Sequence, residues 1–257
     1  MCGMVGRGGK GLYIRTFGCQ MNVYDSQKLA QLLGSEYRLV AAPHEADLII
    51  VNTCSVRAKP EQKLHSVLGE YRKLKRSNPE LLVGVGGCVA QQEGERLLRR
   101  NDVIDFVFGT HNLSLVPGLV RRRKAGAPPE AVVDYRSEWE DLPLGLENGS
   151  AVSALVSVSR GCNKKCAYCI VPLTRGPEIS RAADEIEKEV SLLIRKGAKE
   201  VVLLGQNVNS YGSDLMPPMT FEDLVERLGV LPGLQRIRFT SPHPQQMNER
   251  FVDIVTT

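Results

Sequence analysis

Three apolar stretches near the start of the chain each end on a cysteine, and this repeat limits the folds open to the sequence. GLYIRTFGC, DLIIVNTC and LLVGVGGC end at Cys19, Cys54 and Cys88. Each stretch is rich in β-branched and other apolar residues, as strands are, and helical spacing of apolar residues follows each one. Strands that alternate with helices in this way predict a parallel, doubly wound α/β sheet.

The expected order of elements brings these three cysteines together. Helices are predicted over residues 24–33, 61–75, 93–100 and 113–122, and a fourth strand over residues 104–109. Because the carboxyl ends of parallel strands share one edge of the sheet, where such folds bind ligands, we expect the cysteines to meet there. Three thiolates so placed can hold a [4Fe–4S] cluster with one iron left open. The alternative is three ordinary buried cysteines, because free cysteine is common in cores.

A second group of cysteines lies in the stretch RGCNKKCAYCIVPLTRG. Cys162, Cys166 and Cys169 have the spacing C-x3-C-x2-C, with no histidine or fourth cysteine nearby. Three close thiolates suit a [4Fe–4S] cluster whose fourth iron has no protein ligand. Structural zinc usually takes four ligands, and disulfides belong to secreted chains. The spacing therefore favours an iron–sulfur cluster with an open iron, the arrangement that S-adenosylmethionine needs.

The sequence also predicts how the chain divides. Residues 1–11 are expected to form a flexible leader, and residues 12–123 an N-terminal sheet domain. Residues 124–150, which carry prolines and scattered glycines, are expected to form a linker with at most one short strand. From residue 151 onward three strands alternate with three helices, which predicts about half of a TIM-like barrel over residues 151–257.

Composition restricts the compartment and the partners. The chain has 257 residues, of which 42% are hydrophobic and 24% charged, as in soluble globular proteins. No run is long enough to cross a membrane, and the first residues lack the apolar core of an export signal. We therefore expect a cytoplasmic, reducing location, in which Cys2 is a free thiol. The net charge of +4 permits RNA binding without requiring it.

Six motifs together resemble a known family. RTFGCQMNVYDS, NTCSVR, GGCVAQQ, RGCNKKCAYCIVPLTRGPEISR, LLGQNVNSYG and RFTSPHP occur in the order typical of the radical-SAM methylthiotransferases of the MiaB type. The resemblance extends from about residue 12 to the end of the chain. The residues of the three N-terminal motifs resemble those of the tRNA branch of the family, which acts on N6-isopentenyladenosine.

The resemblance implies two [4Fe–4S] clusters with different tasks. The cluster on Cys162, Cys166 and Cys169 is expected to pass an electron to bound S-adenosylmethionine and so release a 5′-deoxyadenosyl radical, which removes hydrogen from C2 of the adenine. The auxiliary cluster on Cys19, Cys54 and Cys88 is expected to present the sulfur, methylated by a second S-adenosylmethionine. Such cofactors carry the hard chemistry while the protein supplies position.

Further residues and partners follow from the same resemblance. Tyr168 resembles the aromatic residue that the superfamily keeps before its third cysteine, and Gly205 and Gln206 follow a barrel strand where related enzymes contact S-adenosylmethionine. A plain turn after a strand is an equal alternative for Gly205 and Gln206. The expected partners are a tRNA anticodon stem-loop carrying isopentenyladenosine at position 37 and an electron donor such as flavodoxin or ferredoxin. A monomer without membrane contact is expected.

The sequence departs from the family by omission. Only about half of the six strand–helix units of the barrel are expected, and the C-terminal RNA-binding domain is absent, which suggests a truncated product. A non-catalytic iron–sulfur fragment is therefore an alternative to an active tRNA methylthiotransferase. A relative that modifies threonylcarbamoyl-adenosine or a ribosomal protein is a third hypothesis.

Overall fold

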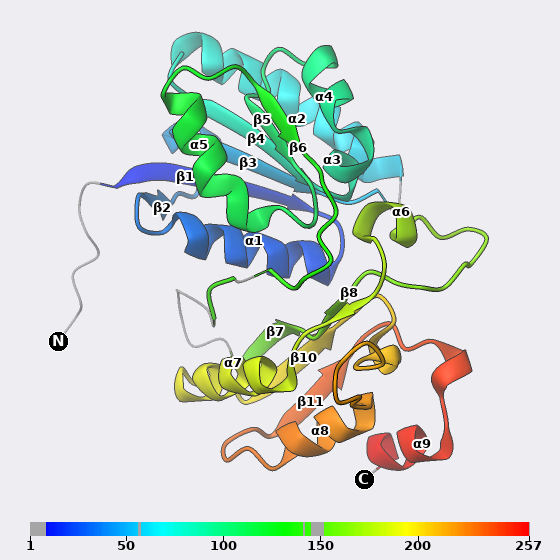
Figure 1. Cartoon of the computed structure of the whole chain (residues 1–257). Helices are drawn as coiled ribbons and strands as arrows, with labels where there is room; N and C mark the ends of the chain where they lie inside the picture. The colour runs from blue at the N-terminus through cyan, green and yellow to red at the C-terminus, as the bar shows by residue number, and fades with distance from the viewer. Residues whose placement is uncertain (1–8, 56–57, 141, 145–151, 257) are drawn as a thin grey trace, which may run out of the picture. The chain divides into compact units, whose positions relative to one another are not determined.

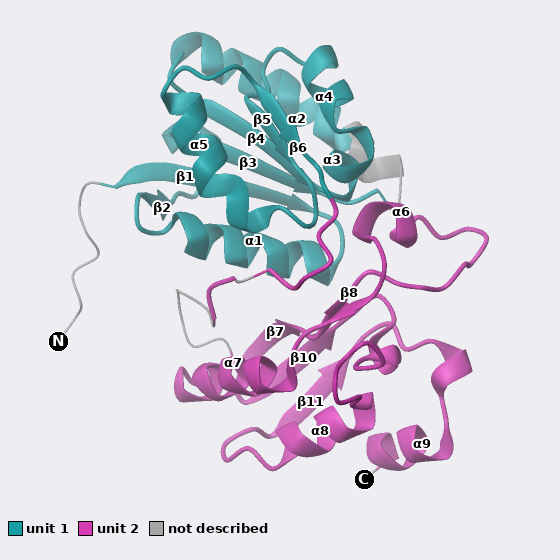
Figure 2. Cartoon of the chain, in the orientation of Figure 1, with its two compact units in different colours: residues 1–134 teal, residues 135–257 magenta. Residues whose placement is uncertain are grey.

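The computed structural model describes residues 9–55, 58–140, 142–144 and 152–256. The chain forms two compact units, Met1–Asp134 and Tyr135–Thr257 (Figure 2). Most of the expected leader lies outside the described residues, and the first strand begins at Lys10. Among the described residues, no helix combines the length and the apolar character needed to cross a lipid bilayer.

Unit 1 alternates strands and helices along the chain (Figure 1). Its elements, in order, are β1 (Lys10–Phe17), α1 (Gln20–Leu33), β2 (Tyr37–Leu39), η1 (Pro43–Glu45), β3 (Leu48–Thr53), α2 (Ala58–Ser77), β4 (Leu82–Gly87), α3 (Cys88–Glu93), α4 (Glu95–Arg100), β5 (Phe106–Phe108), η2 (Leu113–Leu115), α5 (Val116–Lys124) and β6 (Glu130–Val132).

The sheet of unit 1 has the order β2-β1-β3-β4-β5-β6, and all its pairs are parallel. The expected parallel, doubly wound sheet is therefore confirmed. The chain runs from β1 outward to β2 and then crosses back to β3, so the direction of winding reverses between β1 and β3. Ligands of such sheets bind at the carboxyl ends of the strands beside this reversal.

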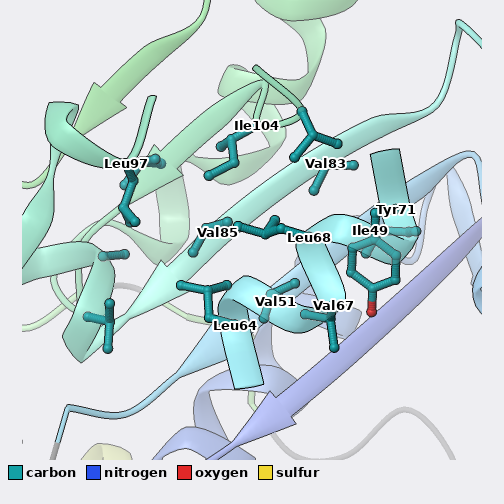
Figure 3. Close-up of a cluster of buried hydrophobic side chains, with 14 of the residues drawn as sticks. Ile49, Val51, Leu64, Val67, Leu68, Tyr71, Val83, Val85, Leu97 and Ile104 are labelled. Carbon is teal, nitrogen blue, oxygen red and sulfur yellow. The ribbon is translucent and has the colours of Figure 1, made fainter. Parts of the chain in front are cut away.

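Helices cover both faces of this sheet, α1 and α5 on one face and α2, α3 and α4 on the other (Figure 1). On the second face, alternate residues of the central strands point toward α2 and form an apolar cluster with it (Figure 3). Its buried members include Ile49, Val51, Leu64, Val67, Leu68, Tyr71, Val83, Val85, Leu97 and Ile104. The rigid centre of the sheet fixes where the loops at its carboxyl edge begin.

Unit 2 contains three strand–helix repeats and a short strand pair (Figure 1). Its elements are β7 (Ser153–Ser157), β8 (Ser159–Arg160), α6 (Val171–Arg175), β9 (Ile179–Ser180), α7 (Ala183–Arg195), β10 (Glu200–Leu204), η3 (Val208–Ser210), α8 (Phe221–Gly229), β11 (Arg236–Phe239), η4 (Pro244–Gln246) and α9 (Glu249–Thr256).

The three longer strands of unit 2 form a parallel sheet in the order β11-β10-β7. The expected partial barrel is therefore confirmed. Helix α7 buries Ile186, Val190 and Leu193, the apolar face that its sequence predicts, against the strands. Helix α8 begins with a capping box, in which the Asp223 N–H donates to Thr220 Oγ1 at 3.1 Å.

The stretch predicted as a linker, residues 124–150, is built into both units over its described part. Lys124 ends α5, and β6 pairs with β5 as the sixth strand of the first sheet. In unit 2 the ring of Trp139 lies 5.3 Å from the guanidinium of Arg160. This part of the chain therefore contributes packing to each unit as well as connecting them.

Candidate metal centres

The register of the first sheet places three cysteines at neighbouring positions on its carboxyl edge. Phe17 of β1 pairs with Thr53 of β3, and Thr53 pairs with Gly87 of β4. Each of these residues ends its strand. Cys19, Cys54 and Cys88 follow within two residues of the three strand ends, so they lie along the same edge, beside the reversal between β1 and β3.

Two glycines let the cysteine-bearing loops approach closely. Gly18 has φ 136°, and a Cβ added there would lie 2.4 Å from the Cβ of Cys54. Gly87 has φ 90°, and a Cβ added there would lie 2.4 Å from the carbonyl oxygen of Thr53. No larger residue fits at either position without moving the backbone. Cys54 and Cys88 are buried, whereas Cys19 is exposed.

Buried amides beneath this edge connect α1 to β3. Asn22 Nδ2 donates to Asn52 Oδ1 at 3.0 Å, and Asn52 Nδ2 donates to the carbonyl oxygen of Asn22 at 2.9 Å and to Ser26 Oγ at 3.0 Å. The Cys19 thiol donates to Asn22 Oδ1 at 3.3 Å. The network therefore fixes the loop of Cys19 relative to the strand that carries Cys54. The sequence signal was an asparagine in an otherwise apolar strand.

The donor set of this edge suits a cluster better than a single ion. Within the described residues, no group of three histidine, cysteine, aspartate or glutamate side chains is arranged to hold one metal ion. A four-iron cube binds each cysteine through a different iron, so its ligands stand farther apart than those of one ion. In addition, the hydroxyl oxygens of Thr53 and Ser55, on either side of Cys54, are buried without a partner in the described structure. Hydroxyls in such positions can donate to cluster sulfur.

The second group of cysteines lies on a loop whose two ends are joined. The strands β8 and β9 pair antiparallel, and the Cys162 N–H donates to the carbonyl oxygen of Gly176 at 3.1 Å. Within the loop the Cys169 N–H donates to the carbonyl oxygen of Cys166 at 3.0 Å. Cys162 is buried, and the other two cysteines are half-buried. The loop is thus joined at its base, near Cys162, while Cys166 and Cys169 remain partly exposed to solvent.

The three thiols of this loop lie close enough to influence one another. Burial raises the pKa of the Cys162 thiol, and the charges of Glu178, Cys169 and Cys166 raise it further. The backbone N–H of Lys164, which donates to Cys162 Sγ at 3.4 Å, acts in the opposite direction. An iron–sulfur cluster would take all three as thiolates, and bound iron would offset the cost of burying that charge.

The structure gives Gln206 a definite contact and leaves Tyr168 exposed. Gln206 Oε1 accepts the backbone N–H of Gly161 at 2.5 Å, directly before the first cysteine of the loop. A Cβ on Gly205 would lie 2.5 Å from Ser159 Oγ, so β10 and β8 approach closely there. Tyr168 is 93% exposed. Gln206 therefore positions the start of the loop whether or not it also contacts a cofactor.

Buried polar atoms beside the loop were not predicted from the sequence. Ser159 Oγ and Asn207 Oδ1 are buried and have no hydrogen-bond partner in the described structure. Glu178 is also buried, accepts a hydrogen bond from Ser210 Oγ, and its own N–H donates to Asn163 Oδ1 at 3.1 Å. Burial raises the pKa of the Glu178 carboxyl. Buried polar groups are normally paired, so a bound polar molecule could supply the missing hydrogen-bond partners of Ser159 Oγ and Asn207 Oδ1.

Known proteins resemble the chain in both units. The family described as "Uncharacterized protein family UPF0004" matches residues 11–109, and the radical SAM superfamily matches residues 156–254. The tRNA-2-methylthio-N(6)-dimethylallyladenosine synthase of Geobacter metallireducens is 51% identical over 95% of the chain and 56% of that protein. The protein of the same name from Geotalea uraniireducens is 49% identical over 94% of the chain and 56% of its own length. The chain thus spans little more than half of these relatives.

A solved structure shows a similar fold. The radical S-adenosylmethionine methyltransferase TsrM from Kitasatospora setae, with tryptophan and an S-adenosylmethionine analogue bound, has a TM-score of 0.60. The match covers 96% of this chain and 57% of TsrM at 13% sequence identity. Fold and sequence together define the class of protein, a radical-SAM protein with an N-terminal UPF0004 domain. Within that class, the chain belongs to the MiaB-type methylthiotransferase family.

Proposed function

We propose that the chain carries the two cluster sites of a tRNA methylthiotransferase that converts N6-isopentenyladenosine at position 37 to its 2-methylthio derivative. The radical-SAM superfamily implies S-adenosylmethionine and a [4Fe–4S] cluster. The observation that carries the proposal of a second cluster is the strand register that sets Cys19, Cys54 and Cys88 side by side at one sheet edge.

In unit 2, Cys162, Cys166 and Cys169 would hold the cluster that binds S-adenosylmethionine. A reduced cluster of this kind, with S-adenosylmethionine bound, supplies radical chemistry on an unactivated C–H bond. Gln206 keeps the loop in place through Gly161. We assign Gly205, Gln206 and Tyr168 to the neighbourhood of the cofactor.

The unpaired polar atoms of Ser159 and Asn207 support a polar cofactor in this place, because its donors and acceptors would satisfy them. The hydrogen bond from the Cys162 N–H to the Gly176 carbonyl oxygen closes the base of the loop, where Cys162 is buried.

In unit 1, Cys19, Cys54 and Cys88 would hold the auxiliary cluster that supplies the sulfur. The hydroxyls of Thr53 and Ser55 are placed beside Cys54 to donate to cluster or substrate sulfur. The asparagine network keeps α1, and with it Cys19, at a fixed position relative to β3. Hydrogen bonds to sulfur and burial are the means by which a protein tunes such a cluster.

Two kinds of partner complete the proposal. The substrate is a tRNA anticodon stem-loop, whose unpaired bases can be turned out of the stack to reach a protein site. The electron donor is a small redox protein of the flavodoxin or ferredoxin type, and the chain acts as a monomer. The names of the relatives favour this function over a fragment without catalysis and over a modifier of threonylcarbamoyl-adenosine or a ribosomal protein.

Iron content tests the two-cluster proposal directly. After anaerobic reconstitution the chain should bind about eight irons, four in each cube. Replacement of Cys162, Cys166 and Cys169 by alanine should leave about half of them, because the other site lies on a separate sheet. Iron and acid-labile sulfide assays, with an absorption spectrum, measure this outcome.

The matched control is Cys2→Ser. Of the seven cysteines in the sequence, Cys2 is the one that belongs to neither proposed cluster site, and it lies outside the described residues. That variant should keep the full iron content. Stoichiometric zinc without iron, or the loss of all iron from the triple variant, would contradict the proposal.

A further inference from the structure

A pocket of about 490 Å³ lies in unit 2, between the segment that follows β10 and the segment that follows β11. Its walls come from η3, from the first residues of α8 and from residues 245–248. Apolar side chains, among them Met219, Phe221 and Met247, share the lining with amides and hydroxyls. Its volume is that of a small-molecule site rather than of a water-sized void.

One carboxylate, that of Glu222, lines this pocket. Glu222 is 4% exposed, and within the described part of the chain no hydrogen bond or ion pair reaches its side chain. Its neighbour Asp223 instead binds Thr220 and Arg250, at 2.8 Å and 2.7 Å. The Glu222 oxygens are not among the side-chain oxygens that are fully shielded from solvent and unpaired, so the carboxylate is open to the pocket that it lines. Its position in the first turn of α8 is one that a carboxylate favours through the helix dipole.

The pocket shares a wall with the loop of the second cluster site. Lys164, which lies between Cys162 and Cys166, donates from Nζ to Gln245 Oε1 at 2.8 Å, and Gln245 lines the pocket. On the other side Ser210, also a lining residue, donates to Glu178. A molecule in the pocket therefore lies one side chain away from the segment that carries the cysteines.

From these observations we infer that the pocket binds a guanine base of the substrate RNA, with the Glu222 carboxylate accepting its hydrogen bonds. This inference rests on the proposed function for the identity of the partner. A carboxylate has two parallel acceptors, and guanine is the RNA base whose Watson–Crick edge presents two adjacent N–H donors. Adenine and cytosine offer one amino group on that edge, and uracil offers one N–H.

Size and lining favour a base over an arginine side chain. A guanidinium presents the same paired donors, but it fills only a small part of the pocket. The side chains of Met219 and Met247 offer apolar contact to the flat faces of a base, and splayed bases of single-stranded RNA stack on protein side chains. The site gives a radical-SAM domain a means to read a nucleotide near its target.

The test uses the 257-residue chain and fluorescein-labelled RNA pentamers UUGUU, UUAUU, UUCUU and UUUUU, measured by anisotropy. The chain should bind UUGUU about tenfold more tightly than the other three, as one good paired contact allows. In Glu222→Gln the preference should fall to less than about twofold, because one acceptor becomes a donor. The matched control is Glu226→Gln, which removes an exposed carboxylate one turn along α8 and should keep the preference.

Two further measurements separate binding from structure. Without RNA, Glu222→Gln should unfold thermally at the same temperature as the parent chain, because no hydrogen bond or ion pair of the described residues holds the carboxylate. Free guanosine should displace UUGUU from the parent chain, whereas adenosine and S-adenosylhomocysteine should not. This competition needs no variant.

Four results would overturn the inference. They are equal binding of all pentamers, a guanine preference that survives in Glu222→Gln, a lower unfolding temperature of that variant, and displacement by acetyl-Gly-Arg-Gly-amide but not by guanosine. The last would assign the pocket to a protein partner. Iron content and cleavage of S-adenosylmethionine are measured on the same samples. A chain that binds no cluster yet prefers guanine would refute the proposed function and leave the pocket as a base-binding site.

Discussion

At the scale of single residues, the cysteine edge of unit 1 depends on two asparagines as much as on its sulfur atoms. Asn22 and Asn52 are buried, and together they make three hydrogen bonds that join α1 to β3. The sequence predicts the edge from its cysteines, because a strand–helix repeat fixes which strand ends meet. It does not predict the asparagine pair, because the partner of a polar residue in a strand depends on which helix crosses it.

The variant Asn52→Ala tests this role. It leaves Asn22 Nδ2 without its partner and removes one of the hydrogen bonds of Ser26 Oγ, which keeps Thr16, so the free energy of unfolding should fall by about 2–3 kcal/mol. Urea unfolding followed by circular dichroism measures the change. The exposed Asn78→Ala should change stability by less than about 0.5 kcal/mol. Equal stability of the two variants would show that the network contributes nothing to the fold.

At the scale of elements, the long strands and helices were predictable, whereas the short elements around the cysteine loop of unit 2 were not. The apolar periodicity of α7 identifies it without tertiary information, as does the β-branched run of β3. The pair β8–β9 has two residues in each strand, and α6 has five residues. Such elements carry no period of their own. They form because Cys162, Gly176 and neighbouring backbone groups pair across the loop.

The segment before unit 2's first strand also takes its structure from tertiary contacts. Trp139 lies against the guanidinium groups of two buried arginines, Arg160 at 5.3 Å and Arg181 at 6.0 Å, and Glu140 makes an ion pair with Arg160 at 3.5 Å. A composition rich in proline and acidic residues predicts a linker here and gives no sign of this packing.

Trp139→Leu should therefore destabilise unit 2 by about 1–2 kcal/mol, because leucine keeps apolar contact but loses both cation–π interactions. Trp139→Phe should restore part of the loss, since its ring keeps a π face. Urea unfolding followed by circular dichroism compares the two. Leucine and phenylalanine variants of equal stability would assign the contact to apolar packing alone. In the parent chain the fluorescence of Trp139, the only tryptophan, reports this segment directly.

At the scale of the whole molecule, the two cysteine sets belong to different sheets in different units. Cys19, Cys54 and Cys88 follow strands of the six-stranded sheet in unit 1, and the other three lie on the loop between β8 and β9 in unit 2. The sequence predicts two domains, each with its own cysteines, because each repeats its own strand–helix pattern. Each unit also has its own buried apolar cluster. Loss of one cysteine set should therefore leave the fold of the other unit intact.

Cys54→Ala is the variant that separates the two sites in function. It removes a ligand of the proposed auxiliary cluster without touching unit 2, so the iron content should fall by about half. Cleavage of S-adenosylmethionine to 5′-deoxyadenosine, with dithionite as reductant, should stay within about twofold of the parent chain, because effects at distant sites are independent. Methylthiolation of an isopentenylated anticodon stem-loop should be lost, as measured by mass spectrometry of the digested RNA.

The matched variant Cys169→Ala should lose both activities, since it removes a ligand of the cluster that binds S-adenosylmethionine. A Cys54→Ala chain that still inserts sulfur would show that unit 1 is not its source, and one that no longer forms 5′-deoxyadenosine would show that the two sites depend on each other.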